Sequence, residues 1–203
     1  MEREVLKKIK LNLNLGIIGK DDSGKEFLIE YLIQIALNHN ESGILHEFLT
    51  VFQDVPIKFR VYTVKDFNQI LIEYESIKRV DILIMVIDIF KLDSLIDINF
   101  KDIEEFNSTY MFKGISILVG IDKYSIEHLD VLHQERINRF DFIQKSKDLG
   151  FLYCFEVKTR NQDISELFNI AINNYILKLR NTNPDLLKKA KSYGKELKNQ
   201  LNF

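Results

Sequence analysis

Two apolar runs restrict the folds open to this chain more than any other feature of its sequence. The run "ILIMVI" covers residues 82–87 and "ISILVGI" covers residues 115–121, and both consist mainly of β-branched and aliphatic side chains. A strand with apolar side chains on both faces needs a covering layer on each, as strands of parallel sheets have. Longer segments with helical spacing lie around these runs. The alternation predicts an α/β fold with a mostly parallel sheet and helices on both faces.

The order of the expected elements narrows this fold class. We expect strands at residues 8–19, 44–52, 57–64, 81–90, 114–122 and 151–157, and helices at residues 24–38, 67–78, 93–108, 132–148 and 163–180. The second and third strands are separated only by "QDVP", in which Pro56 is a turn signal, so they should pair antiparallel. The prediction is therefore a six-stranded, mostly parallel sheet with one antiparallel edge pair.

Composition and charge limit the domain number and the classes of partner. With 203 residues, of which 46% are hydrophobic, the chain can fill one sizeable core. We expect a domain over residues 1–180 and an appendage over residues 181–203. The formal charge of −2 predicts no nucleic-acid partner. The longest apolar run is too short for a transmembrane segment, so a cytoplasmic location is expected.

The appendage has the pattern of a basic amphipathic helix. Asn183 is a suitable N-cap and Pro184 suits the first helical position. One stripe of the helix carries Leu186, Ala190, Tyr193, Leu197 and Leu201, and five lysines occupy the other positions. Such a helix over residues 184–201 can make peripheral contact with an anionic membrane or occupy a partner's groove. Docking onto its own domain is the interpretation that we favour.

The segment "GIIGKDDSGKE", residues 16–26, nearly matches the phosphate-binding pattern G-x-x-x-x-G-K-[ST]. Gly19, Gly24 and Lys25 fit the pattern, but Glu26 stands where a hydroxyl normally binds magnesium. A loop between a buried strand and a helix directs backbone N–H groups at one point, and the lysine reaches the terminal phosphates of a ligand. The alternative is a glycine-rich turn with a solvated lysine. Asp21 and Asp22 add negative charge that a bound polyphosphate would have to overcome.

Several segments together resemble the Ras-like small GTPases, especially the Rab and Ras types. After the loop come "VIDIFKLDSLIDI", "ISILVGIDKYS" and "FEVKTRNQDISELF", which resemble this family's later strands in the right order over residues 9–180. The resemblance implies a P-loop NTPase three-layer sandwich that binds GTP or GDP, with Mg²⁺ as a possible companion. It also implies regulatory or effector proteins as partners.

The resemblance assigns the nucleotide contacts to two regions. The phosphate contacts would come from Gly19, Lys20, Asp21, Asp22, Ser23, Gly24, Lys25 and Glu26, and the base contacts from Asp122, Lys123, Ser125, Val157 and Lys158. Ser125 replaces the aspartate that reads guanine in the family, whereas Lys123 and Lys158 are retained. A bidentate base contact is worth about 1 to 3 kcal/mol of discrimination. Guanine selectivity should therefore be weakened.

The resemblance is weakest at the metal site and at the residue that orients the attacking water. The family's D-x-x-G motif falls on Thr63 or on Asp66, depending on the register, and is incomplete in both. The glutamine that follows it would be Phe67 or Ile70. Candidate magnesium ligands are Glu26 and Asp66. Because phosphoryl transfer depends on positioning and charge stabilisation, hydrolysis should be very slow or absent.

Two further functions stay open, and two kinds of site are not expected. The chain is either a nucleotide-binding protein or a pseudoGTPase, an interaction or scaffold subunit whose loop is filled by its own carboxylates; a small P-loop kinase is a weaker alternative.

The chain ends "QLNF", which predicts no prenylation. His39, His46, His128 and His133 are scattered without helical pairing, so no metal site is expected from them.

Overall fold

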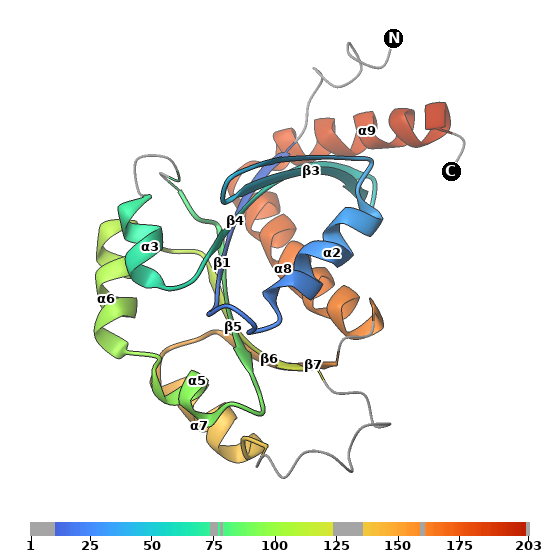
Figure 1. Cartoon of the computed structure of the whole chain (residues 1–203). Coiled ribbons are helices and arrows are strands. Elements are labelled where there is room, and N and C mark those ends of the chain that lie inside the picture. The colour runs from blue at the N-terminus through green and yellow to red at the C-terminus, as the bar shows by residue number, and fades with distance from the viewer. Residues whose placement is uncertain (1–10, 74–76, 78, 124–135, 159–160, 202–203) are drawn as a thin grey trace.

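A seven-stranded mixed sheet forms the centre of the molecule (Figure 1). The computed structural model describes residues 11–73, 77, 79–123, 136–158 and 161–201. The strands are β1 (Leu11–Ile18), β2 (Asn38–Ser42), β3 (Leu45–Phe52), β4 (Val55–Val64), β5 (Ile82–Asp88), β6 (Ile115–Asp122) and β7 (Tyr153–Lys158). Their spatial order is β2-β3-β4-β1-β5-β6-β7. Strands β2, β3 and β4 pair antiparallel, and the other pairs are parallel.

The α/β class and the mostly parallel sheet are confirmed, but the expected strand number and the single antiparallel pair were wrong. The additional strand is β2, whose sequence "NHNES" contains no apolar residue and is largely exposed. Its pairing with β3, from Asn38↔Leu49 to Ser42↔Leu45, makes it an edge strand. Backbone hydrogen bonds rather than burial hold such a strand in place, so apolar periodicity does not reveal it.

The hairpin between β3 and β4 is tighter than its sequence suggested. Gln53 and Asp54 form its turn with φ values of 47° and 63°, and two left-handed residues match the twist of the strands that they join. Pro56 was expected in this turn, yet it lies within β4 opposite Val51. The two left-handed residues reverse the chain by themselves, which leaves Pro56 to the strand.

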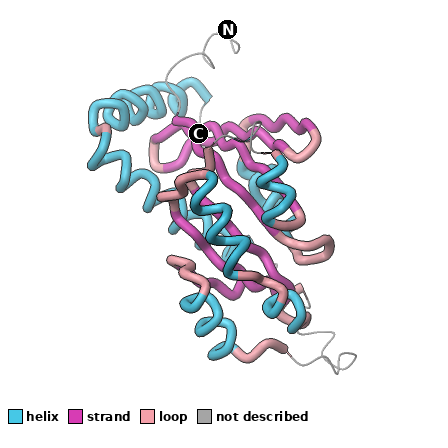
Figure 2. Tube along the Cα trace, turned by 90° about the vertical axis from the view of Figure 1, so that its left-hand side faces the viewer, coloured by secondary structure: helices cyan, strands magenta, loops and turns pink. Residues whose placement is uncertain are grey.

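The helices form two layers around the sheet. They are α2 (Lys25–Ile35), α3 (Phe67–Ile72), α5 (Leu92–Ile96), α6 (Phe100–Thr109), α7 (Arg139–Asp148), α8 (Asn161–Thr182) and α9 (Pro184–Leu201). Helices α2, α8 and α9 pack on one face of the sheet. Helices α3, α5, α6 and α7 pack on the other, and helices of this layer pass in front of the strands in Figure 2.

Alternate side chains of β5 enter the two layers. Ile82, Ile84 and Val86 belong to the core beneath α2 and α8, whereas Leu83, Met85 and Ile87 belong to the core beneath α3 and α6. The prediction of a strand covered on both faces is therefore confirmed.

The single helix expected over residues 93–108 is in fact two, because Asn99 interrupts it. The Asn99 side chain accepts a hydrogen bond from the Lys101 N–H at 3.0 Å and so begins α6 as its N-cap. The helix expected over residues 132–148 begins at Arg139 among the described residues, and residues 132–135 lie outside them.

Helix α9 lies across the sheet near β3 and β4 (Figure 1). The Asn183 side chain accepts a hydrogen bond from the Leu186 N–H at 3.2 Å, as expected of its N-cap. Ala190 and Leu197 of the predicted apolar stripe are buried, and so is Leu187 beside it, so this side of the helix packs on the chain's own domain. Among the described residues, no helix has both the length and the apolar character required to cross a membrane.

Candidate functional site

The loop between β1 and α2 depends on two glycines that no other residue could replace without strain. A Cβ atom on Gly19 would lie 2.5 Å from the Ser23 hydroxyl oxygen and 2.8 Å from the carbonyl oxygen of Val86. Gly24 has a left-handed backbone, with φ of 98°, and a Cβ there would lie 2.7 Å from Ile121. The loop can therefore curl tightly against β5 and β6, as a phosphate-binding loop must.

The N-terminus of α2 is left without a side-chain cap. Its N-cap residue is Gly24, which offers no side-chain hydrogen bond to the first turn. By contrast, α3, α6 and α7 are capped by Asp66, Asn99 and Asn138. The first N–H groups of a helix need an acceptor, and the helix dipole favours an anionic one. The start of α2 is consequently suited to an anion, unlike the starts of these three helices.

The Lys25 side chain folds back over this loop. Its Nζ donates to the carbonyl oxygen of Gly19 at 2.5 Å and to that of Lys20 at 3.4 Å. An Asp21 carboxylate oxygen lies 3.7 Å from the same Nζ. Burial lowers the pKa of Lys25, while the charges of Asp21 and Glu26 act in the opposite direction. The ammonium group is therefore held at the centre of the loop.

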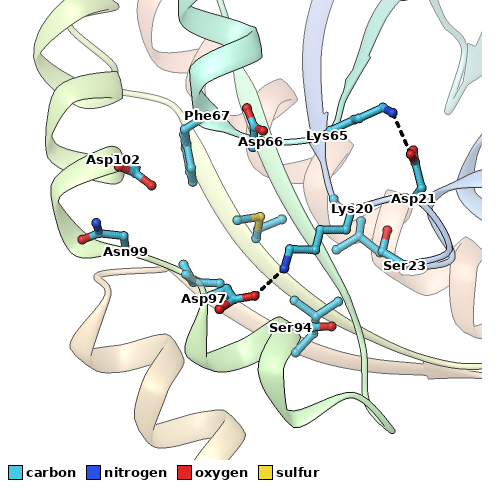
Figure 3. A pocket seen from close by; sticks show the side chains of 15 residues that line it. Lys20, Asp21, Ser23, Lys65, Asp66, Phe67, Ser94, Asp97, Asn99 and Asp102 are labelled. Carbon is cyan, nitrogen blue, oxygen red and sulfur yellow. Dashed lines mark hydrogen bonds and ion pairs between the residues drawn. The ribbon is translucent and has the colours of Figure 1, made fainter.

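Two ion pairs connect the loop to segments far away in the sequence, and both are visible in Figure 3. The Lys65 Nζ, just after β4, lies 2.7 Å from an Asp21 carboxylate oxygen. This hydrogen bond lowers the pKa of Asp21 and raises that of Lys65. The Lys20 ammonium donates to the carboxylate of Asp97, the residue that ends α5. Neither Lys65 nor Asp97 was expected at the site, because their pairing depends on tertiary contact.

A cavity of about 430 Å³ opens beside the loop. Its lining includes the loop, the residues after β4, the end of β5, and residues of α5 and α6. Ser23 lines the cavity and is only 4% exposed, and its hydroxyl oxygen has no hydrogen-bond partner among the described residues. A buried hydroxyl normally has a partner. The Ser23 hydroxyl and the uncapped start of α2 are therefore two polar groups of the loop that lack a protein partner in the described part of the chain.

The two candidate magnesium ligands lie in different environments. Glu26 is exposed on the first turn of α2 and is not among the residues that line the cavity. Asp66 does line the cavity, but its Oδ1 accepts the Gln69 N–H at 2.8 Å and so caps α3. The Gln69 side-chain oxygen in turn accepts a hydrogen bond from the N–H of Lys65, the residue before Asp66, at 2.8 Å. Asp66 therefore already has a structural role that its position in the sequence did not reveal.

The expected base-contacting residues lie at the ends of two neighbouring strands. Asp122 is opposite Lys158 in the pairing of β6 with β7, so the structure brings these two segments together. Lys123 follows Asp122, but its Nζ lies 3.5 Å from a carboxylate oxygen of Asp88, whose side chain is 1% exposed. Asp88 was not expected here, although it ends the long apolar run of β5.

The remaining predicted base contacts differ in what they can offer. Val157 is buried in the core, which leaves only its backbone for a ligand. Lys158 is exposed, and its N–H donates to Asp163 at the start of α8 at 3.2 Å. Ser125 lies outside the described residues. Among the loop residues, Lys20, Asp21 and Asp22 are exposed.

Comparison of the sequence with models of protein families found no match, and comparison with curated proteins found none either.

Proposed function

We propose that this chain binds GTP or GDP, with weakened guanine selectivity, through the loop from Gly19 to Lys25. The observation that carries the proposal is the uncapped start of α2 beside the Lys25 ammonium. Backbone N–H groups, a helix dipole and a lysine at one point suit the phosphates of a nucleotide. The unpartnered Ser23 hydroxyl adds a donor at the same loop. As in Ras-like GTPases, the protein would act through contacts with regulatory or effector proteins.

Hydrolysis of the nucleotide would be very slow or absent. Phe67 and Ile70, which stand where the family has its water-orienting glutamine, are both buried and apolar. Glu26 has no hydroxyl for Mg²⁺, and Asp66 uses one carboxylate oxygen to cap α3. Phosphoryl transfer gains almost all its rate from positioned charges and an oriented nucleophile. A chain without these groups can retain the nucleotide as a bound ligand with little turnover.

Weak base selectivity agrees with the position of Lys123. In the family, the stem of this lysine packs on the base. Here its ammonium lies near the buried carboxylate of Asp88, and an uncompensated buried carboxylate is costly. We therefore expect Lys123 to remain beside Asp88, which leaves the stem of Lys158 to stack against the base.

A second candidate function is a pseudoGTPase that binds no nucleotide and acts as an interaction or scaffold subunit. One observation favours it: the Asp21 carboxylate lies close to both Lys25, at 3.7 Å, and Lys65, at 2.7 Å. A carboxylate between two ammonium groups occupies part of the position that a phosphate would take. Asp21 is exposed, however, and exposed ion pairs are weak, so a polyphosphate can displace it.

Two measurements on the full chain separate the candidates. The first denatures the purified protein and identifies any released nucleotide. The second follows thermal unfolding with excess GTP, GDP or ATP, with and without Mg²⁺. A ligand at 100 times its Kd stabilises the folded state by about 2.7 kcal/mol.

Variants make the second measurement specific to the loop. Lys25→Ala should lose the nucleotide-dependent shift. Lys101→Ala, which removes the same charge from an exposed position on α6, should keep it. Absence of both a released nucleotide and a thermal shift in the wild type would overturn nucleotide binding and favour the second candidate.

A further inference from the structure

The hairpin of β2 and β3 gathers two histidines and a glutamate that lie apart in the sequence. Glu41 is directly opposite His46 in the strand pairing. His39 precedes Glu41 by two residues on β2, so both side chains point to the same face of the sheet. The His39 Nε2 lies 3.4 Å from the His46 Nδ1, and a Glu41 carboxylate oxygen lies 3.8 Å from that Nδ1. One ligand atom from each residue lies within 4.8 Å of the other two.

The spacing of these atoms suits a tetrahedral metal ion. Zinc binds histidine nitrogen at about 2.0 to 2.1 Å, so two nitrogens at corners of a tetrahedron around it lie about 3.4 Å apart. The two histidine nitrogens already have this separation.

A buried aromatic ring holds the two imidazoles. The His39 ring stacks on Phe48 at a centroid distance of 4.7 Å and an angle of 10°. The His46 ring is also nearly parallel to Phe48, at 6.1 Å and 5°. Phe48 itself is only 1% exposed. Positioning of this kind reduces the entropy lost when ligands converge on a metal, and the Glu41 side chain, which is 59% exposed, lies on the solvent side.

We propose that His39, Glu41 and His46 bind a zinc ion on the β2–β3 hairpin, with water as the fourth ligand. Two imidazoles and one carboxylate form a ligand set typical of zinc sites with an open position. In the metal-free hairpin, one facing nitrogen donates its proton to the other. A zinc ion binds through a lone pair on each of these two nitrogens. The shared proton must therefore move to the other nitrogen of the ring that carries it, and the rings turn toward the ion. The bound ion would clamp the polar edge strand β2 to β3.

The proposal does not depend on nucleotide binding, and it differs from the expectation from the sequence that these histidines form no metal site. That expectation was based on the absence of helical spacing between the histidines and of cysteine partners. Here the ligands alternate along one strand and face a residue of the next, so the pairing register, rather than the spacing, brings them together.

The test is calorimetric titration of the metal-free full chain with Zn²⁺, with Mg²⁺ as a comparison ion. We expect a single strong zinc site and no comparable magnesium site, because Mg²⁺ prefers oxygen ligands. Titration with Co²⁺ gives an independent measurement, since tetrahedral Co²⁺ absorbs strongly in the visible range. His39→Ala and Glu41→Gln should each weaken zinc binding at least about 100-fold, because loss of even an outer-shell partner costs 10- to 100-fold.

Two control variants should bind zinc as the wild type does. Asn40→Ala changes the residue between two ligands, whose side chain points to the opposite face of the strand. Glu104→Gln makes the same chemical change as Glu41→Gln at an exposed position of α6, a helix that supplies none of the three ligands. Circular dichroism and thermal unfolding without metal will show that each variant is folded. Zinc binding that is undetectable in the wild type, or unchanged in both His39→Ala and Glu41→Gln, would overturn the proposal.

Discussion

Gly194 of α9 passes so close to Asp54 in the β3–β4 turn that no side chain fits between them. A Cβ atom on Gly194 would lie 1.9 Å from the carbonyl oxygen of Asp54. The Lys198 ammonium, one turn later, lies 2.8 Å from the Asp54 carboxylate, and this hydrogen bond lowers the pKa of that carboxyl group. The glycine that weakens α9 as an isolated helix therefore permits its docking on the sheet.

Whether replacement of Gly194 raises or lowers the free energy of unfolding tests the docking of α9. In a solvated helix, Gly→Ala stabilises by up to about 1 kcal/mol. In the docked helix, Gly194→Ala forces α9 away from Asp54, and we expect a destabilisation of about 1 to 3 kcal/mol. Urea unfolding will measure the difference. Lys189→Ala, at an exposed position of α9, should change stability by less than about 0.5 kcal/mol. A stabilised Gly194→Ala variant would contradict the docking.

Gly24→Ala tests the shape of the loop. We expect a loss of about 1 to 3 kcal/mol in the free energy of unfolding, because the left-handed backbone is strained for alanine and the added Cβ would press on Ile121 at 2.7 Å. Gly43→Ala is a matched control, since Gly43 also has positive φ, 59°, but has nothing within 4 Å of an added Cβ. If the two variants lose equal stability, contact with Ile121 contributes nothing.

Asp21→Asn tests whether the loop's own carboxylate competes with a ligand. The change releases Lys25 and Lys65 from their ion pairs and removes a repulsive charge. Ion pairs at an exposed site are weak, so GDP affinity should rise by a few-fold. Titration with a fluorescent GDP analogue will measure it. Asp22→Asn, in an exposed neighbour, controls for the loss of net charge. An equal gain in both variants would argue against specific competition by Asp21.

The stability of the fold above pH 10 should depend on Tyr175. Burial, reinforced by Asp81, raises the pKa of this phenol from 10.0 to about 12. Its hydroxyl donates to the carbonyl oxygen of Asn12 at 2.8 Å. The folded protein keeps the proton that the unfolded chain loses, so stability is complete below pH 10 and declines as the pH rises toward 12. The linked loss approaches about 3 kcal/mol.

Tyr175→Phe separates this titration from the hydrogen bond. The variant should lose about 1 kcal/mol at neutral pH, where only the hydrogen bond is missing. Above pH 10 its stability should decline less steeply than that of the wild type. Urea unfolding at several pH values measures both effects. Parallel curves for the two proteins would show that the phenol does not titrate abnormally.

Local sequence patterns were sufficient for most of the fold because burial depends on residue type. The run at residues 82–87 is apolar on both faces, and it became a strand with cores on both sides. The glycine loop that the sequence predicted between a strand and a helix is present, and its Gly19 and Gly24 leave no room for a Cβ atom. The interruption at Asn99 was missed because the capping residue lies within a pattern that otherwise continues as helix.

Polar pairing, in contrast, depends on which distant segments meet. Lys65 lies 44 residues from Asp21, and Lys20 lies 77 residues from Asp97. Strand β2 has no apolar face, and the register of its pairing with β3, rather than the spacing along the chain, joins His39 to His46. Hydrophobic periodicity is encoded within a few residues, so the chain alone specified its apolar strands, most of its helices and its glycine loop. Ion pairs and ligand clusters form only when folding brings separate segments within a few ångströms, so the charges around that loop and the histidine pair emerged from the tertiary structure.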